Sequence, residues 1–231
     1  RLYKRLRHYG MKSYGEYLLM LASDRQELTT AVDLLTTNET HFFREPKHFT
    51  WMQQSLLPTL SYPKRIRIWS AAASTGQEAY SLAMLLHDNL GENGWEVFGS
   101  DVSSQVLNTA KQGLYPISLA DEIPENYLKA YCLKGVGKHE GLMKISPTLI
   151  NKVSFDQINL NKELPNVGMF DVIFLRNILI YFQQDTKQSV VARVLKTLKP
   201  GGHLIIGHSE TLHGMFSSLK SIAPSIYQKI S

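Results

Sequence analysis

Asp101 follows the strand-like run Trp95–Ser100, and a loop of small residues around Ala72 follows the earlier alternating run Arg65–Ser70. Small side chains let backbone N–H groups approach a ligand closely, and an acid about 20 residues further on accepts hydrogen bonds from ribose hydroxyls. The loop lacks the G-x-G-x-x-G spacing of a dinucleotide site. These residues therefore predict a site for an adenosine-containing ligand, with capping of the next helix as the structural alternative for Asp101.

Glu78 stands near the start of the helix-like segment Gln77–Leu90. The helix dipole alone favours an acid there, which is the structural explanation. The functional explanation is that a carboxylate repels a pyrophosphate but attracts a cationic ligand. S-adenosylmethionine (SAM) carries a sulfonium and an ammonium group and no phosphate. Glu78 therefore favours SAM as the cofactor, with S-adenosylhomocysteine (SAH) as its product.

Three polar residues, Arg176, Asn177 and Tyr181, follow the apolar run Val172–Leu175. Polar residues at the carboxyl end of a central parallel strand face the ligand crevice. A salt bridge at the sheet edge is the alternative for Arg176, yet an unpaired buried arginine is costly, which favours a role in the site. Methyltransferases that act on base amines often carry Asn/Asp-Pro-Pro-Tyr at this point. Its absence counts against a nucleic-acid amine as the acceptor.

The run TTNETHFFR, which ends at Arg44, is the other segment dense in polar groups. Phe42 and Phe43 within it are predicted to belong to the core. Asn38, Thr40 and Arg44 are too polar and too close to these aromatic residues to be a merely solvated loop, and they are candidate site residues.

From residue 65 onward, strand-like runs alternate with helical ones, which predicts an α/β fold of the Rossmann type with a parallel sheet between helices. A turn is expected at Lys199–Gly202, and Leu219–Ile230 is expected to close the sheet as an antiparallel pair. The predicted strands are Arg65–Ser70, Glu96–Ser100, Val153–Leu160, Val172–Leu175 and Leu204–Gly207, and the predicted helices are Gln77–Leu90, Ser103–Gln112 and Gln184–Leu198.

The domain organisation follows from the same change of pattern. Residues 1–60 have a helical period and are predicted to form a helical domain and linker, and residues 61–231 the α/β domain. Residues 113–152 interrupt the alternation and contain several turn-forming glycines, which predicts a small inserted subdomain of antiparallel strands. The chain opens on Arg1 rather than on Met, so we expect a fragment whose first domain is truncated.

The 231 residues carry a net charge of +5, and basic residues cluster before the first acid. This cluster (Arg1, Lys4, Arg5 and Arg7) is either a solvated helix face or a surface for an acidic partner. Aromatic interleaving of the kind that stacks bases is weak, which argues against nucleic acid. A single cysteine, no long apolar run and no histidine pattern of metal ligands predict a cytoplasmic protein without membrane insertion or a metal. A monomer is the default expectation.

Taken together, the motifs resemble the chemotaxis receptor (protein-glutamate) O-methyltransferase family, the CheR type, which esterifies glutamates of chemoreceptors. The resemblance covers nearly the whole chain in the family's order. Its segments are TNETHFFREPKHF (Thr37–Phe49), IWSAAASTGQEAYSLAM (Ile68–Met84), SDVSSQVLNTAKQGLY (Ser100–Tyr115), GKHEGL (Gly137–Leu142), FDVIFLRNILIYF (Phe170–Phe182) and LKPGGHLIIGHSE (Leu198–Glu210).

The resemblance implies a helical N-terminal domain, a SAM-dependent methyltransferase domain and an inserted β-subdomain. It places Arg44 and Tyr181 nearest the transferred methyl group as catalytic candidates. It implies that the basic residues of the first helix meet the receptor's acidic methylation helices. The β-subdomain is similar to that of members tethered by a receptor's C-terminal peptide. The cofactor-binding candidates, from the motifs and the resemblance together, are Asn38, Thr40, Arg44, Ala72, Glu78, Asp101, Asn159, Leu160, Arg176 and Asn177.

The implied reaction is direct displacement at the sulfonium methyl by a glutamate carboxylate. With a reference pKa of about 4.3 the acceptor is already ionised at neutral pH, so no general base is needed. Two other functions stay open: a methyltransferase for a different acceptor, such as a small acid or RNA, and a non-catalytic module that senses the cofactor. Methyl transfer to substrates without a carboxylate supports the first, and cofactor binding without turnover supports the second.

Overall fold

The computed structural model describes residues 1–60 and 65–230. The predicted domain boundary at residue 61 falls outside these residues. The α-helices are α1 (Tyr3–His8), α2 (Tyr14–Leu21), α3 (Arg25–Leu35), α4 (Lys47–Trp51), α5 (Gln77–Leu90), α6 (Ser104–Gln112), α7 (Glu125–Tyr131), α8 (Pro147–Ile150) and α9 (Gln184–Lys196). The strands are β1 (Ile66–Ser70), β2 (Trp95–Asp101), β3 (Leu114–Pro116), β4 (Cys132–Lys134), β5 (Leu142–Ile145), β6 (Val153–Gln157), β7 (Phe170–Leu175), β8 (Leu198–Ile206), β9 (Leu219–Ala223) and β10 (Ile226–Lys229).

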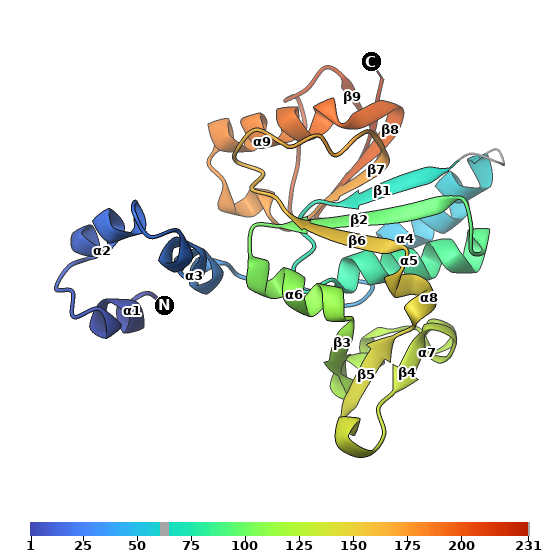
Figure 1. Cartoon of the computed structure of the whole chain (residues 1–231). Helices are drawn as coiled ribbons and strands as arrows, with labels where there is room; N and C mark the ends of the chain where they lie inside the picture. Colours follow the sequence, from blue (N-terminus) through green and yellow to red (C-terminus); the bar gives the residue numbers. More distant parts are fainter. Residues whose placement is uncertain (61–64, 231) are drawn as a thin grey trace.

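The centre of the fold is a seven-stranded sheet in the order β6-β2-β1-β7-β8-β10-β9 (Figure 1). The five strands from β6 to β8 are parallel, and β10 pairs antiparallel with both β8 and β9. The chain adds β2 and β6 on one side of β1 and β7 and β8 on the other, so the strand order reverses at β1. The carboxyl ends of strands at such a reversal border a crevice. This arrangement confirms the predicted Rossmann-like fold and its antiparallel closure.

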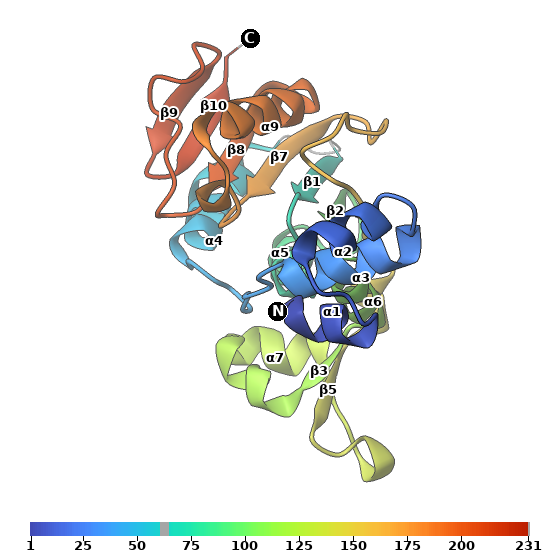
Figure 2. The same cartoon turned by 90° about the vertical axis from the view of Figure 1, so that its left-hand side faces the viewer.

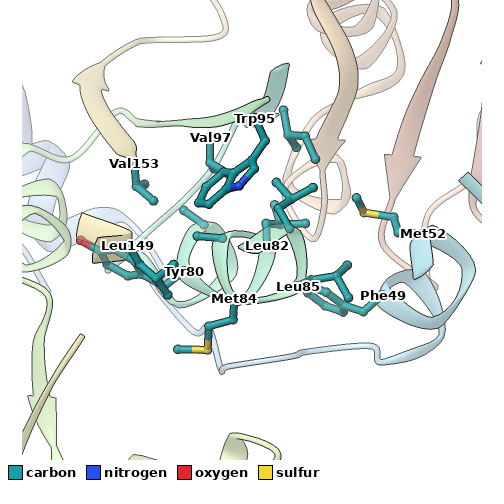
Figure 3. Packing of buried hydrophobic residues seen from close by; sticks show 14 of the residues in the cluster. Phe49, Met52, Tyr80, Leu82, Met84, Leu85, Trp95, Val97, Leu149 and Val153 are labelled. Atoms are coloured by element: carbon teal, nitrogen blue, oxygen red, sulfur yellow. The ribbon is translucent and has the colours of Figure 1, made fainter. Parts of the chain in front are cut away.

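The sheet is buried on both faces, and its central strand β7 shows why. Val172 and Phe174 belong to the core that also contains α5, whereas Ile173 and Leu175 belong to the core that contains α9. A strand between two apolar layers has apolar side chains at every position, as predicted for this run. Figure 3 shows the first core, in which α5 side chains such as Leu82 lie against strands β1, β2 and β6 and against α4.

Short loops at the carboxyl ends of β1 and β2, which border the crevice, lead into helices α5 and α6. Gly76, at φ +95°, precedes α5, and a Cβ there would lie 2.9 Å from the Cβ of Ala110 on α6. Ser103 caps α6, because its hydroxyl accepts a hydrogen bond from the Val106 N–H at 3.3 Å. Asp101 is therefore not the cap of α6, which removes the structural alternative for that residue.

Two predicted elements differ from the structure. The residues predicted as a turn, Lys199–Gly202, lie inside β8 as a bulge, because Phe170 pairs with Leu198 while Val172 pairs with His203. An ion pair between the Lys199 ammonium and Asp171 at 2.7 Å holds this bulge against β7. The predicted strand Val153–Leu160 ends at Gln157, and its last apolar residues turn into the crevice.

The predicted inserted subdomain is present. Strands β3, β5 and β4 form an antiparallel sheet in that order, and it projects beyond α6 and α8 at the bottom of Figure 1. Its inner side chains, including Tyr115 and Met143, join the core around α5. The insertion is therefore attached to the main domain by a shared apolar core rather than by its two connections alone.

Helices α1–α3 form a separate cluster with its own small core of Leu6, Tyr17, Leu21 and Ala31. At its centre, the buried carboxylate of Glu27 accepts hydrogen bonds from the side chains of Arg5, Tyr9 and Tyr17. Figure 2 shows α3 in front of α6, which it contacts. The end of α3 leads straight into the polar run before Arg44.

Candidate active site

A cavity of about 500 Å³ opens at the carboxyl ends of β1, β2 and β7. Its volume is that of a typical small-molecule site. All of the predicted cofactor-binding and catalytic candidates line it, although they come from five separate segments of the chain. These residues are Asn38, Thr40, Arg44, Ala72, Glu78, Asp101, Asn159, Leu160, Arg176, Asn177 and Tyr181.

Asp101 joins the loop after β1 to the turn after β2. One carboxylate oxygen accepts from the Ser74 N–H at 2.9 Å, and the other accepts from the Ser103 N–H at 3.0 Å. Burial raises the pKa of Asp101, while these backbone hydrogen bonds act in the opposite direction. Each oxygen keeps a second lone pair, so the carboxylate can still accept from a ligand hydroxyl.

The Ala71–Gly76 loop approaches the crevice with little side-chain bulk. The Ala71 N–H donates to the Phe174 carbonyl at 2.8 Å, and the Ala73 N–H donates to the Ser100 carbonyl at 2.8 Å. The loop is therefore tied to both neighbouring strands, which fixes its place at the cavity wall. This is the close backbone approach that the small residues predict.

Glu78 is paired rather than free. Its Oε2 accepts from Arg176 Nη1 at 2.7 Å, and its Oε1 accepts from the Ser70 hydroxyl at 2.7 Å. Both residues of the pair border the cavity, so Arg176 combines the two roles considered for it: it lies in a salt bridge and lines the crevice. The wall consequently presents a carboxylate and a guanidinium side by side.

The polar residues after β7 are held by a buried acid. Asn177, at φ +57°, donates its N–H to Glu210 at 3.0 Å, and Glu210 also accepts from the N–H groups of Leu179 and Gly207, both at 2.7 Å. Glu210 thus has a structural role. Tyr181 follows in a short 3₁₀ helix at the cavity mouth, and its side chain is 60% exposed.

The run that ends at Arg44 lines the cavity with its polar residues and packs into the core through Phe42 and Phe43. Phe42 is buried, as predicted, and Phe43 is half-buried and stacks on Tyr127. The Asn38 carbonyl accepts from the Ser74 hydroxyl at 3.1 Å, which ties this run to the loop after β1. The two aromatic residues therefore hold the polar residues on either side of them, Thr40 and Arg44, at the cavity.

Two features of the site were missed in the sequence. The end of α3 contributes apolar wall residues, including Val32 and Leu35, which look like ordinary members of an amphipathic helix. Glu45 lies just outside the wall, and its carboxylate contacts Arg176 and Asn177. Its place next to Arg44 in the polar run was the available signal.

Glu45, His48 and His208 are close enough together to be considered for a metal ion. However, Arg176 Nη2 lies 3.1 Å from the same Glu45 oxygen, and a guanidinium so near repels a cation. We assign no ion to this cluster.

The four predicted substrate-binding residues do not line the cavity. Arg1 donates to the Leu35 carbonyl at the end of α3 at 3.0 Å, and Arg5 pairs with buried Glu27. Among the described residues, the side chains of Lys4 and Arg7 have no ion-pair partner, and both are exposed. Lys4 and Arg7 are therefore the better placed of the four to meet a partner.

Comparison with known proteins decides the family. Residues 38–227 match the sequence model of the "CheR methyltransferase, SAM binding domain", and residues 1–36 match the "CheR methyltransferase, all-alpha domain". The chain belongs to the CheR methyltransferase family. Most of the residues that line the cavity lie in the part that matches the SAM-binding domain, and the match confirms the predicted enzyme class and the predicted cofactor.

Individual relatives agree with this membership. The chemotaxis protein methyltransferase of Salmonella typhimurium strain LT2 is 39% identical over 237 residues, covering 98% of this chain and 80% of that protein. The chemotaxis protein methyltransferase of Escherichia coli K12 is 42% identical over 220 residues, covering 91% and 74%. Among solved structures, the glycopeptide N-methyltransferase MtfA complexed with sinefungin has a TM-score of 0.45 at 13% identity, covering 75% of this chain and 53% of that one.

Proposed function

We propose that this member of the CheR methyltransferase family transfers the methyl group of SAM to glutamate side chains of chemoreceptor cytoplasmic helices. The products are glutamate methyl esters and SAH. The observation that carries the proposal is the cavity at the carboxyl ends of β1, β2 and β7, with Asp101 and the Glu78–Arg176 pair on its wall, in a chain of this family.

The wall residues fit SAM by their chemistry. Asp101 has lone pairs left for ribose hydroxyls. The amino-acid end of SAM carries an ammonium and a carboxylate, and the paired Glu78 and Arg176 supply charges of the opposite sign for each. Asn38, Thr40, Asn159, Leu160, Ala72 and Asn177 complete the proposed cofactor contacts.

When bound, SAM supplies an electrophilic methyl group on a positively charged sulfur. We assign Arg44 and Tyr181, at the cavity mouth, to the acceptor: Arg44 orients the carboxylate by charge, and Tyr181 by its hydroxyl. The apolar wall residues Ile158 and Phe182 exclude water, which removes hydration from the attacking carboxylate. The acceptor is ionised at neutral pH, so the chain supplies no general base.

The proposed partner surfaces lie on the two smaller units, the α1–α3 cluster and the inserted β-subdomain. We propose that exposed Lys4 and Arg7 face the acidic methylation helices, with Arg1 and Arg5 shaping that surface through their bonds to α3. The β-subdomain is the proposed site for a receptor's C-terminal tether. The proposed domains are 1–60 and 61–231, with the insertion at 113–152. We propose that the protein works as a monomer in the cytoplasm. In the described part of the chain, no helix is long and apolar enough to cross a bilayer.

The test is transfer of labelled methyl from SAM to a chemoreceptor cytoplasmic fragment, scored as label released by mild alkali. Alkali-labile label on the fragment supports the proposal, since esters hydrolyse and methylated amines do not. Label on a small acid or RNA instead points to a different acceptor. SAM binding without transfer to any acceptor makes the chain a sensing module.

A further inference from the structure

The backbone of residues 42–44, which carries the Arg44 side chain, lies outside the helices and strands. The Phe43 N–H donates to the Ser81 hydroxyl of α5 at 2.9 Å. The Arg44 carbonyl accepts from Arg176 Nη2 at 2.5 Å. Phe43 has φ +52°, an uncommon conformation for a bulky residue, which persists only where the surroundings fix it. The position of Arg44 at the cavity therefore depends on side chains from other parts of the chain.

The inserted subdomain supplies a third hydrogen bond to this segment. Glu122 ends the short 3₁₀ helix Ile117–Glu122, and its Oε2 accepts from the Phe42 N–H at 2.9 Å. The bond is partly buried, where a hydrogen bond is stronger than in open water. Three consecutive residues therefore each have one backbone group held by a side chain from a different element.

Aromatic contacts hold the same subdomain against the segment. Phe42 meets the Tyr115 ring edge to face with the ring centroids 5.1 Å apart, and Phe43 stacks on Tyr127 at 5.3 Å. Apolar packing of this kind keeps the two parts close together but is not directional. The hydrogen bond to Glu122 is directional, so it fixes the orientation of the backbone that the aromatic rings hold in place.

We propose that Glu122 is a positioning residue for methyl transfer: from the inserted subdomain it fixes the segment before Arg44, and so orients the Arg44 guanidinium towards the acceptor. This inference rests on the proposed function, in which Arg44 orients the acceptor carboxylate. Arg44 Nη1 donates to the Glu39 carbonyl at 2.9 Å, and the backbone below it decides where its other N–H groups point. A displacement of about 1 Å near the reacting groups costs up to about a hundredfold in rate. The inserted subdomain then contributes to turnover as well as to the proposed tether.

The test measures kcat for methyl transfer to a chemoreceptor fragment, and the Kd for SAM by calorimetry, in Glu122→Ala and Glu122→Gln. Alanine removes the acceptor of the Phe42 N–H, whereas the side-chain oxygen of glutamine keeps it. We expect the alanine variant to lose about tenfold in kcat, with the Kd for SAM changed less than about threefold, and the glutamine variant to stay within about twofold in both. The matched control is Asp121→Ala, an exposed acid of the same 3₁₀ helix, which leaves both values unchanged.

Two further measurements separate positioning from general damage to the fold. Because Glu122 acts through Arg44, Glu122→Ala should lower kcat no further in an Arg44→Ala background. Hydrogen exchange in residues 40–46 should quicken in Glu122→Ala but not in Glu122→Gln, and this readout needs no activity. If the alanine variant does not fold, Glu122→Asp replaces it, because the shorter side chain draws the oxygen away from the Phe42 N–H and should cause the same losses.

Four results overturn the inference. They are an unchanged kcat in Glu122→Ala, equal losses of kcat and SAM affinity, the same loss in Glu122→Gln as in Glu122→Ala, and a full further loss in the Arg44→Ala background. If the unaltered protein transfers no methyl group to the fragment, the proposed function fails instead, and the exchange result still decides whether Glu122 holds this segment.

Discussion

Asp101 holds two backbone segments with the same carboxylate that we propose for cofactor binding. It ties the loop after β1 to the turn after β2 through two backbone N–H groups, and its remaining lone pairs face the cavity. A ligand that uses those lone pairs meets an acceptor already fixed in direction. The affinity of the site and the order of the loop are consequently coupled at this residue.

Asp101→Asn is expected to weaken both the SAM affinity of the site and the order of the loop after β1. The amide NH2 of asparagine would face the N–H of either Ser74 or Ser103, so one of these donors loses its acceptor. An unsatisfied buried donor costs about 1–3 kcal/mol of stability. SAM affinity is expected to fall at least about tenfold, as measured by calorimetry. Asp121→Asn, an exposed acid, is the control. An Asp101→Asn protein with unchanged SAM affinity contradicts the assignment of Asp101 to the cofactor.

Arg44 is expected to act on the reaction more than on binding. Its guanidinium lies at the cavity and donates to the Glu39 carbonyl at 2.9 Å, with further N–H groups left for an acceptor carboxylate. Arg44→Ala should lower kcat about a hundredfold while the Kd for SAM changes less than about threefold. Steady-state kinetics and calorimetry measure the two. Equal losses in both make Arg44 a cofactor-binding residue instead.

The site residues at strand ends could be predicted from the sequence, because their positions next to strands and helices are visible in the local sequence pattern. Asp101, Glu78 and Arg176 were identified from their places after or before regular elements, and the structure puts all three on one cavity. The partners of Arg176 were not predictable: Glu45 lies far from it in the sequence, and only the tertiary fold brings the two together.

At the scale of elements, helices α1–α3 depend on one buried acid. Glu27 on α3 accepts from Arg5 and Tyr9 of the first helical segment and from Tyr17 of α2. The hydrogen bond from Arg5 is the main cause that lowers the pKa of Glu27 to about 2. The three helices have only a small apolar core, so this polar centre carries much of their mutual orientation.

Glu27→Gln is expected to destabilise this cluster by about 3 kcal/mol, because it leaves Arg5 without its charged partner. Hydrogen exchange is expected to quicken in α1–α3 while the sheet stays protected. Glu163→Gln, an exposed acid in the loop before β7, should change stability by less than about 0.5 kcal/mol. Unchanged exchange in α1–α3 of the Glu27 variant contradicts the central role of this acid.

Helices with a clear apolar periodicity could be predicted from the sequence, whereas features that depend on how strands pair could not. The helix Gln77–Leu90 has the bounds predicted for it, since its apolar period and flanking glycines are local signals. The sequence predicts a turn where β8 has a bulge, because proline and glycine indicate an interruption of regular structure without showing whether it is a turn or a bulge. The register with β7 and the Lys199–Asp171 pair decide it.

At the scale of the whole molecule, His48 links stability to pH. Its pKa is about 4 in the folded protein and about 6.5 in an unfolded chain. Between these values the unfolded state binds the proton and the folded state does not, so acid favours unfolding. Stability is complete above pH 6.5 and is expected to fall by up to about 3 kcal/mol as the pH drops towards 4.

His48→Gln has no proton to take up, so its stability should fall less over the same window. Urea unfolding at several pH values measures the two slopes. His203, whose pKa burial also lowers, is present in both proteins and cancels in the comparison. Identical slopes contradict the assignment of this pH dependence to His48.

Three parts of the molecule line one cavity. They are the carboxyl ends of the sheet strands, the run that ends at Arg44, and the end of α3, which contributes apolar side chains. The α1–α3 cluster carries the proposed partner surface and also borders the cavity that we propose for the cofactor. A receptor helix that binds Lys4 and Arg7 lies on the unit that also borders the proposed SAM site.

The most direct measurement is mass spectrometry of a chemoreceptor cytoplasmic fragment after incubation with SAM and this protein. We expect the mass of one added methylene on glutamate side chains, reversed by mild alkali and strongly reduced with Arg44→Ala. A methyl group on another residue type, or none on a fragment that binds the SAM-loaded protein, contradicts the account.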